Sequence, residues 1–240
     1  MKILAIEASG PVAGCALLED GVLTAEYSVQ YKKKHSQSLV PMLDEMKRML
    51  DLQLSSIDFL AVTEGPGSFT GLRIGAATVK GLGLALDKPV LPVPTVDSLA
   101  CNLFGTDRLI CPLMDARRQQ VYTGIYENAG ELRVIEPQCV VALSEITQKL
   151  NALGREVIFL GDGVPVNEAA LGEQMTVPYL IAPAHVNRQR AASTAVRAAQ
   201  IYAERADAAL VSADDFRPEY LRIPQAERER GDKRNYKVFV

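Results

Sequence analysis

A short glycine-rich segment between an apolar run and a long apolar stretch constrains the fold of this chain most strongly. Residues 64–75 read EGPGSFTGLRIG; the apolar run 59–62 precedes them, and the proline-free apolar stretch 76–86 follows. This order predicts a buried strand, a tight turn and a helix, as in an α/β layer. Ser68 or Thr70 can cap the first turn of that helix.

The turn does not match a known phosphate-loop fingerprint. It lacks the Gly-Lys-Ser/Thr ending of a P-loop, and position 70 is threonine where a dinucleotide-binding loop requires glycine. Gly65 and Gly67 permit a positive φ or a close backbone approach. Two interpretations remain open: a tight turn that feeds a core helix, or a helix N-terminus whose free N–H groups face an anion.

The predicted helix contains several glycines. Gly71 and Gly75 are four residues apart, and Gly81 and Gly83 follow. Each glycine inside a helix costs roughly 1 kcal/mol relative to alanine. Close approach of another backbone would explain them, and that backbone belongs either to the same lobe or to a partner chain.

The predicted elements follow the order βββαβα twice, which indicates a duplicated α/β lobe with a boundary near residues 105–107. In the first half we expect strands at 2–8, 14–19, 22–29, 59–62 and 90–93, and helices at 36–52, 70–86 and 95–104, the last capped by Thr95. In the second half we expect strands at 109–114, 119–127, 132–135, 157–160 and 177–181, and helices at 144–153, after 163 and at 191–206. Residues 213–224 are expected to add a closing strand, and residues 225–240 a flexible tail.

Charge and cysteine content exclude several classes of protein. The formal net charge is −3, so bulk electrostatics does not indicate nucleic-acid binding. No apolar run is long enough to span a bilayer. The four cysteines form no CxxC motif, as expected of small core residues in a reducing compartment. We therefore expect a cytoplasmic protein.

Few residues offer catalytic or metal-binding chemistry. His35 and His185 are far apart and belong to no HxxxH or HExxH motif, so a zinc site is not expected. Glu7 and Glu64 each follow a strand of the first lobe, where two carboxylates could hold a magnesium ion. Residues 115–118, DARR, could contact an anion, although an exposed hairpin corner with a salt bridge is the simpler interpretation.

Four segments of the chain resemble one protein family. LAIEAS at residues 4–9, EGPGSFTGLRIG at 64–75, DARR at 115–118 and PEYLR at 218–222 are similar to the TsaB (YeaZ) family of bacterial tRNA threonylcarbamoyladenosine biosynthesis proteins. The matches span residues 3 to about 223. The resemblance implies the fold of actin-like ATPases and sugar kinases, with two RNase H-like lobes: an N-terminal, partner-binding lobe at 1–105 and a C-terminal lobe at 106–224.

The resemblance also implies a non-catalytic role. TsaB proteins pair with TsaD, which binds metal and transfers threonylcarbamoyl to the adenosine beside the anticodon of tRNAs that read codons starting with A; the ATPase TsaE joins them. The two metal-binding histidines of TsaD correspond to Thr95 and Leu99 in this sequence, and the first strand ends Glu7-Ala8-Ser9 rather than Asp-Thr-Ser. We therefore expect no intrinsic cofactor, ATP and metal only through partner subunits, and tRNA contact only through the complex.

In the family, the first two helices of the N-terminal lobe build the contact with TsaD. The implied interface residues are Met42, Met46, Met49, Gly71, Leu72, Gly75, Ala76, Thr78 and Val79. The same helices could pair two copies of the chain when TsaD is absent. A vestigial nucleotide site would comprise Glu7, Ser9, Glu64 and Gly65. If Gly75 faces the partner, Gly75→Leu should weaken the complex and spare the lone chain.

Two other functions remain as alternatives. The first is an active ATP-dependent kinase or hydrolase that uses Glu7 and Glu64 around magnesium. The second is a metallopeptidase, and the missing ligand histidines argue against it.

Overall fold

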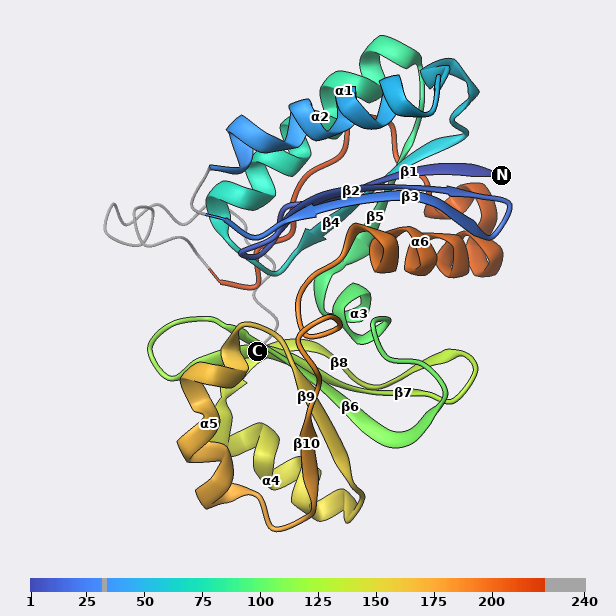
Figure 1. The fold of residues 1–240 in the computed structure, drawn as a ribbon. Coiled ribbons are helices and arrows are strands. Elements are labelled where there is room, and N and C mark those ends of the chain that lie inside the picture. The colour runs from blue at the N-terminus through green and yellow to red at the C-terminus, as the bar shows by residue number, and fades with distance from the viewer. Residues whose placement is uncertain (32–33, 223–240) are drawn as a thin grey trace.

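Each half of the chain folds around one five-stranded mixed sheet (Figure 1). The computed structural model describes residues 1–31 and 34–222. The strand orders are β3-β2-β1-β4-β5 and β10-β9-β6-β7-β8. The central strands β1 and β6 each pair antiparallel with the next strand and parallel with a later one. The expected fold, two tandem α/β lobes with mixed sheets, is confirmed.

Most element bounds lie within a few residues of those predicted, but β8 runs seven residues beyond the expected strand at 132–135 and α3 ends four residues before the expected 104. The first sheet comprises β1 (Lys2–Glu7), β2 (Ala13–Glu19), β3 (Val22–Val29), β4 (Phe59–Gly65) and β5 (Val90–Pro94). The second comprises β6 (Thr106–Asp115), β7 (Gln120–Asn128), β8 (Leu132–Ala142), β9 (Val157–Leu160) and β10 (Tyr179–Ile181). The helices are α1 (His35–Met49), α2 (Phe69–Leu86), α3 (Thr95–Ala100), α4 (Leu143–Leu153), α5 (Gly163–Gln174) and α6 (Ala191–Arg205). None of the helices in the described part of the chain is both long and apolar enough to cross a membrane.

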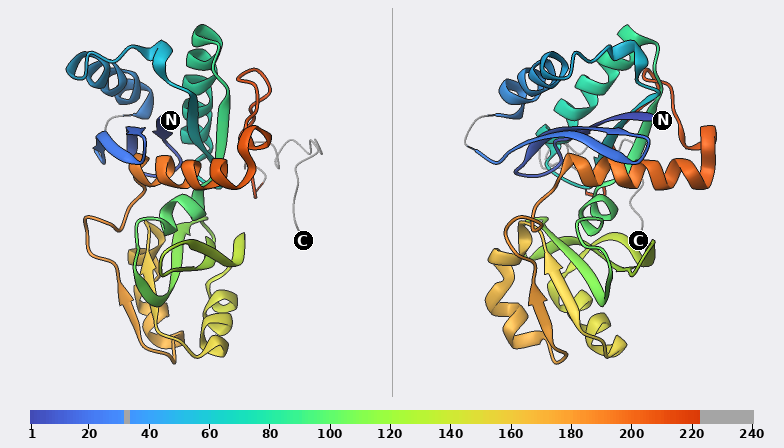
Figure 2. Two further views of the ribbon diagram at one scale, coloured as in Figure 1. Left: turned by 90° about the vertical axis from the view of Figure 1, so that its right-hand side faces the viewer. Right: turned by 45° about the vertical axis from the view of Figure 1, so that its right-hand side comes forward.

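Helices cover both faces of the first sheet (Figures 1 and 2). Even-numbered apolar residues of β1 and β4, such as Leu4 and Val62, pack in one core cluster with residues of α1 and α2. Odd-numbered residues, such as Ala5 and Ala61, pack in another cluster with residues of α6. This alternation is the period of two that a strand imposes on its side chains.

The position of helix α6 differs from the expected division of the chain into lobes. A division at residue 105 assigns α6 to the second lobe, yet its buried residues Ala195, Ala198 and Ile201 pack against the first sheet. Two of these three are alanines, whose small side chains let the helix lie close to the sheet. The chain therefore returns to the first lobe after β10.

The segment that follows α6, residues 211–222, stays on the first lobe. The predicted closing strand does not form in the described residues: Val211 makes a single antiparallel bridge to Val90, and residues 213–222 contain no strand. Phe216 is 2% exposed and anchors the segment in the core beneath α1 and α2. The expected flexible tail, residues 225–240, lies outside the described residues.

Helix α3 connects the two lobes. Its residues Val96 and Leu99 pack against the second sheet. Asp97 of α3 joins both lobes, because it pairs with Arg197 of α6 at 3.2 Å and accepts a hydrogen bond from Tyr126 of β7 at 2.9 Å. The predicted capping role of Thr95 is wrong, because Pro94 occupies the N-cap position and Thr95 already belongs to the helix. Helices α4 and α5 pack on the opposite face of the second sheet.

Candidate functional site

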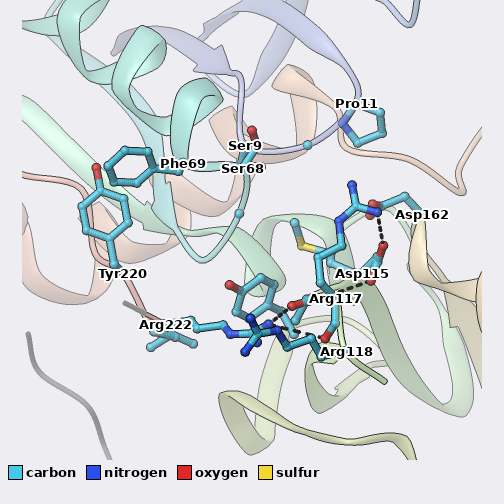
Figure 3. A pocket seen from close by; sticks show the side chains of 16 residues that line it. Ser9, Pro11, Ser68, Phe69, Asp115, Arg117, Arg118, Asp162, Tyr220 and Arg222 are labelled. Atoms are coloured by element: carbon cyan, nitrogen blue, oxygen red, sulfur yellow. Dashed lines mark hydrogen bonds and ion pairs between the residues drawn. The ribbon is translucent and has the colours of Figure 1, made fainter. Parts of the chain in front are cut away.

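A pocket of about 500 Å³ lies between the two lobes (Figure 3). Segments far apart in the sequence meet there. They are the β1–β2 loop at 9–11, the turn before α2 at 67–69, the β6–β7 hairpin at 114–118 with Tyr122, residue Asp162 before α5, and residues 220–222. Of the expected vestigial nucleotide site, Ser9 is the member that lines this pocket.

The glycine-rich turn is shaped by close backbone contacts. Gly65 has φ +137°, and a Cβ there would overlap the carbonyl oxygen of Glu219. A Cβ on Gly67 would overlap the carbonyl oxygen of Ser9. Ser68 is the N-cap of α2: its hydroxyl accepts from the N–H of Gly71 at 3.3 Å. The turn therefore packs between the β1–β2 loop and the segment 211–222.

Glu7 is buried at the end of β1. Its carboxylate accepts hydrogen bonds from the N–H of Ser9 at 2.6 Å and from the Ser9 hydroxyl at 2.5 Å, and Thr194 of α6 donates to it at 3.4 Å. Burial raises the pKa of Glu7, and these hydrogen bonds oppose the rise. The carboxylate therefore faces α6 and the first lobe's interior.

Glu64 lies near the end of β4, where the pairing of β4 with β5 shifts register between Thr63 and Gly65. Burial, together with the nearby charges of Glu219 and Asp97, raises the pKa of Glu64 to about 7. Glu7 is hydrogen-bonded to Ser9 and Thr194, so the two carboxylates have different neighbours. Within residues 1–31 and 34–222 no group of three or more potential metal ligands occurs.

The histidine-related positions do not form a site either. His35 lies with Nε2 2.8 Å from the carbonyl oxygen of Gly10, and His185 is exposed in a loop. Thr95 and Leu99, the positions expected from the resemblance to match the histidines of TsaD, are fully buried in α3.

The structure corrects most of the expected partner interface. Seven of the nine residues are buried inside the first lobe: Met42, Met46, Gly71, Leu72, Gly75, Ala76 and Val79. A Cβ on Gly71 would overlap the carbonyl oxygen of Ala8, and a Cβ on Gly75 would lie 3.5 Å from atoms of Ala8 and Val62. Gly71 therefore lets α2 lie against its own sheet, whereas the distances at Gly75 are ordinary van der Waals contacts. Because Gly75 is buried inside its own lobe, we now expect the larger side chain of Gly75→Leu to destabilise the lone chain.

Other residues form the outer face of these two helices. Met49 is 68% exposed and Thr78 is half-buried, so both remain on the surface. The prediction missed the neighbouring exposed residues Val40, Ala77, Gly81 and Leu84. A Cβ on Gly81 would meet no atom within 4 Å. The helical period separates 71, 75 and 79 from 77, 81 and 84, so the second set could have been found in the sequence.

The β6–β7 hairpin carries two of the three arginines that line the pocket, Arg117 and Arg118. Asp115 accepts from the N–H of Arg117 at 2.7 Å and pairs with its guanidinium at 3.1 Å, which confirms the predicted hairpin corner with a salt bridge. Arg117, Arg118 and Gln119 have φ values of +62°, +55° and +60°. Arg222 donates to the carbonyl oxygens of Ala116 and Arg117 and so attaches the end of segment 211–222 to the hairpin.

Comparison with known proteins identifies relatives along the whole chain. A family model described as TsaD, tRNA N6-adenosine threonylcarbamoyltransferase, matches residues 25–229. The tRNA threonylcarbamoyladenosine biosynthesis protein TsaB of Bacillus subtilis is 34% identical over 228 residues, covering 95% of this chain and 96% of that protein. TsaB of Escherichia coli is 30% identical, covering 68% of this chain and 72% of that protein.

Solved structures agree with these matches. YeaZ from Pseudomonas aeruginosa superposes with a TM-score of 0.75 at 26% identity, covering 92% of this chain and 99% of that one. The identity to the B. subtilis protein extends over nearly the full length of both chains. The chain therefore belongs to the TsaB (YeaZ) family of tRNA threonylcarbamoyladenosine biosynthesis proteins.

Proposed function

We propose that this chain is a non-catalytic subunit that supports a TsaD-type transferase in forming threonylcarbamoyladenosine on tRNA. The modified adenosine is the one beside the anticodon of tRNAs that read codons starting with A. TsaD carries the transferase activity, TsaE joins the pair, and ATP and metal enter through these partners. The tRNA is reached through the complex.

The different surroundings of Glu7 and Glu64 carry this proposal. A magnesium-dependent kinase or hydrolase of the kind considered above needs both carboxylates around one ion. Glu7 is instead hydrogen-bonded to Ser9 and Thr194, and the charges near Glu64 are those of Glu219 and Asp97. The geometry thus favours a supporting subunit over the ATP-dependent enzyme.

The outer face of α1 and α2 is the surface we propose for the partner. It comprises Val40 of α1 and Ala77, Thr78, Gly81 and Leu84 of α2, all exposed except the half-buried Thr78. Val40 and Leu84 are 58% and 62% exposed, so both can contribute apolar surface to a contact. Gly81 has no intramolecular neighbour that requires a glycine. A TsaD helix lying close to α2 would explain both features, and a second copy of this chain is the competing occupant.

The test is the affinity of the purified chain for TsaD. Gly81→Leu adds a side chain to the proposed contact and improves helix propensity, so the lone variant should melt no lower than wild type. Forcing that side chain into a packed contact costs roughly 1–3 kcal/mol, which weakens the complex about tenfold or more. Gly130→Leu is the matched control, because Gly130 is an exposed glycine of the second lobe with nothing within 4 Å of its Cβ position.

Calorimetric titration with TsaD and mass spectrometry of digested tRNA give the two readouts. Gly81→Leu should lower both the affinity and the level of modified adenosine, and Gly130→Leu should change neither. Equal affinities of the two variants would refute the helix-face contact. Transfer of threonylcarbamoyl to tRNA by the isolated chain would refute the non-catalytic role.

A further inference from the structure

A groove of about 410 Å³ lies beside the end of strand β3, and it shares no lining residue with the pocket of Figure 3. Residues 26–30 form one wall, and residues 184–190, which lead from β10 into α6, form the other. We propose that this groove, called the β3 groove below, binds an extended peptide segment of a partner protein through a carboxylate side chain of that segment. The proposal goes beyond the supporting function, and its failure would leave the contact with TsaD untouched.

The wall at residues 26–30 belongs to the open edge of a sheet. In the described part of the chain, β3 is the terminal strand of the first sheet and pairs with β2. Ser28 is exposed, and the apolar side chain of Val29 is 41% exposed. Backbone N–H and C=O groups along such an edge can pair with an added strand. The edge therefore offers main-chain hydrogen bonds to an extended peptide.

The β3 groove lies on the face of the first sheet that α6 covers. The carboxylate of Glu26 accepts from the N–H of Ala192 at 3.1 Å and pairs with Arg190 at the start of α6. The next residue of the strand, Tyr27, points the other way and contacts Met49 of α1. The β3 groove and the surface proposed for TsaD are therefore on opposite sides of the sheet.

The β3 groove contains an arginine without an acidic partner. The charge of Arg190 is balanced by Glu26. Arg188 donates through Nη1 to the carbonyl oxygen of Gly161 and to two oxygens of Asn187, all of which are neutral acceptors. Within residues 1–31 and 34–222 its Nε and Nη2 make no hydrogen bond, and it forms no ion pair. Because Nη1 fixes the guanidinium, these two nitrogens can donate together to one carboxylate.

The neighbouring side chain of Gln189 is buried without a hydrogen-bond partner. Gln189 is 2% exposed, and neither its amide oxygen nor its amide nitrogen makes a hydrogen bond in the described chain. It lies near Asp162 and opposes the rise that burial causes in the pKa of that carboxyl, but the two side chains form no hydrogen bond. Buried polar groups are nearly always paired. The donors and acceptor of this amide complement the C=O and N–H of a peptide group.

These features together favour an acidic peptide over a small acid. A free carboxylate can bind Arg188, but it leaves the strand edge and the Gln189 amide unpaired. An extended peptide with a glutamate can satisfy all three. The formal net charge of the chain is −3, so bulk electrostatics does not attract an acidic peptide. A preference for a carboxylate must therefore come from local contacts.

Calorimetric titration of the full chain with capped heptapeptides tests the β3 groove. The peptides consist of alternating threonine and valine with one glutamate at each position in turn, and each has a glutamine counterpart. At least one glutamate peptide should bind about tenfold tighter than its counterpart, because it alone makes the charge-assisted contact. The absence of binding, or equal affinities within every pair, would overturn the proposal. Glutarate that binds as tightly as the best peptide would overturn the peptide assignment.

Two variants locate the contact. Arg188→Gln should remove the preference for glutamate over glutamine. Arg133→Gln is the matched control and should keep that preference, because Arg133 is an exposed arginine of β8 whose ion pair with Glu127 lies outside the groove. Equal losses in both variants would indicate non-specific attraction and overturn the proposal.

Nuclear magnetic resonance of the wild-type chain gives a readout that does not depend on how the variants fold. Addition of the best glutamate peptide should shift the side-chain amide signals of Gln189 and the backbone amide signals of residues 26–30. Shifts confined to other parts of the chain would place the peptide elsewhere and refute the β3 groove.

Discussion

Alanine at Gly71 and at Gly81 should change the stability of this chain in opposite directions. Both glycines lie in α2, and alanine improves helix propensity by about 0.8–1 kcal/mol at either position. At Gly81 the new Cβ meets nothing within 4 Å, so this gain should appear in full. At Gly71 the Cβ overlaps the carbonyl oxygen of Ala8, a backbone atom at the end of β1 that cannot rotate away.

The magnitude of the Gly71 effect follows from this overlap. Overpacking in a well-packed core costs about 1–3 kcal/mol, and contact with backbone belongs at the upper end of that range. After the propensity gain, Gly71→Ala should lose on the order of 2 kcal/mol. For a chain of this size 1 kcal/mol corresponds to roughly 2–4 °C. Gly71→Ala should therefore melt about 4–8 °C below wild type, and Gly81→Ala about 2–4 °C above it.

Thermal unfolding followed by circular dichroism, with urea unfolding as a second measurement, checks both variants on the isolated chain. A Gly71→Ala variant that melts at or above wild type would refute the packing of α2 on the β1–β2 loop. It would then restore the expectation that this face of α2 is free for a partner. A fall in stability of Gly81→Ala would show that Gly81 has an intramolecular role.

Two further predictions concern the buried carboxylates. Because the pKa of Glu64 is raised from 4.5 to about 7, the folded chain binds more protons than the unfolded chain between these values, and its stability falls as pH rises through this window. Glu64→Gln should remove that fall. Between pH 4 and pH 8 the free energy of unfolding of the variant, measured by urea unfolding, should therefore rise by on the order of 3 kcal/mol relative to that of wild type. Parallel pH profiles of the two proteins would contradict this prediction. Glu7→Ala leaves the Ser9 and Thr194 donors without their acceptor, so it should lower the free energy of unfolding by about 2–4 kcal/mol. The level of tRNA modification per folded molecule should stay near wild type, and a drop below about a tenth would contradict the supporting role.

The sequence by itself determined the order and type of the elements. The glycine-rich turn, the strands β1 and β4 and the helices α1 and α2 lie within a few residues of their predicted bounds, because apolar periodicity and turn residues act locally. The DARR hairpin with its internal salt bridge is also a local feature, and it was predictable.

Only the tertiary structure decided which surfaces these elements share. Helix α6 crosses back to the first sheet, and segment 211–222 then reaches the β6–β7 hairpin through Arg222. The stripe of Gly71 and Gly75 packs on the chain's own β1–β2 loop, although a glycine stripe in the sequence is equally compatible with a partner. The pocket combines residues more than 200 positions apart. Such contacts depend on the relative placement of complete layers, and no local pattern in the chain encodes that placement.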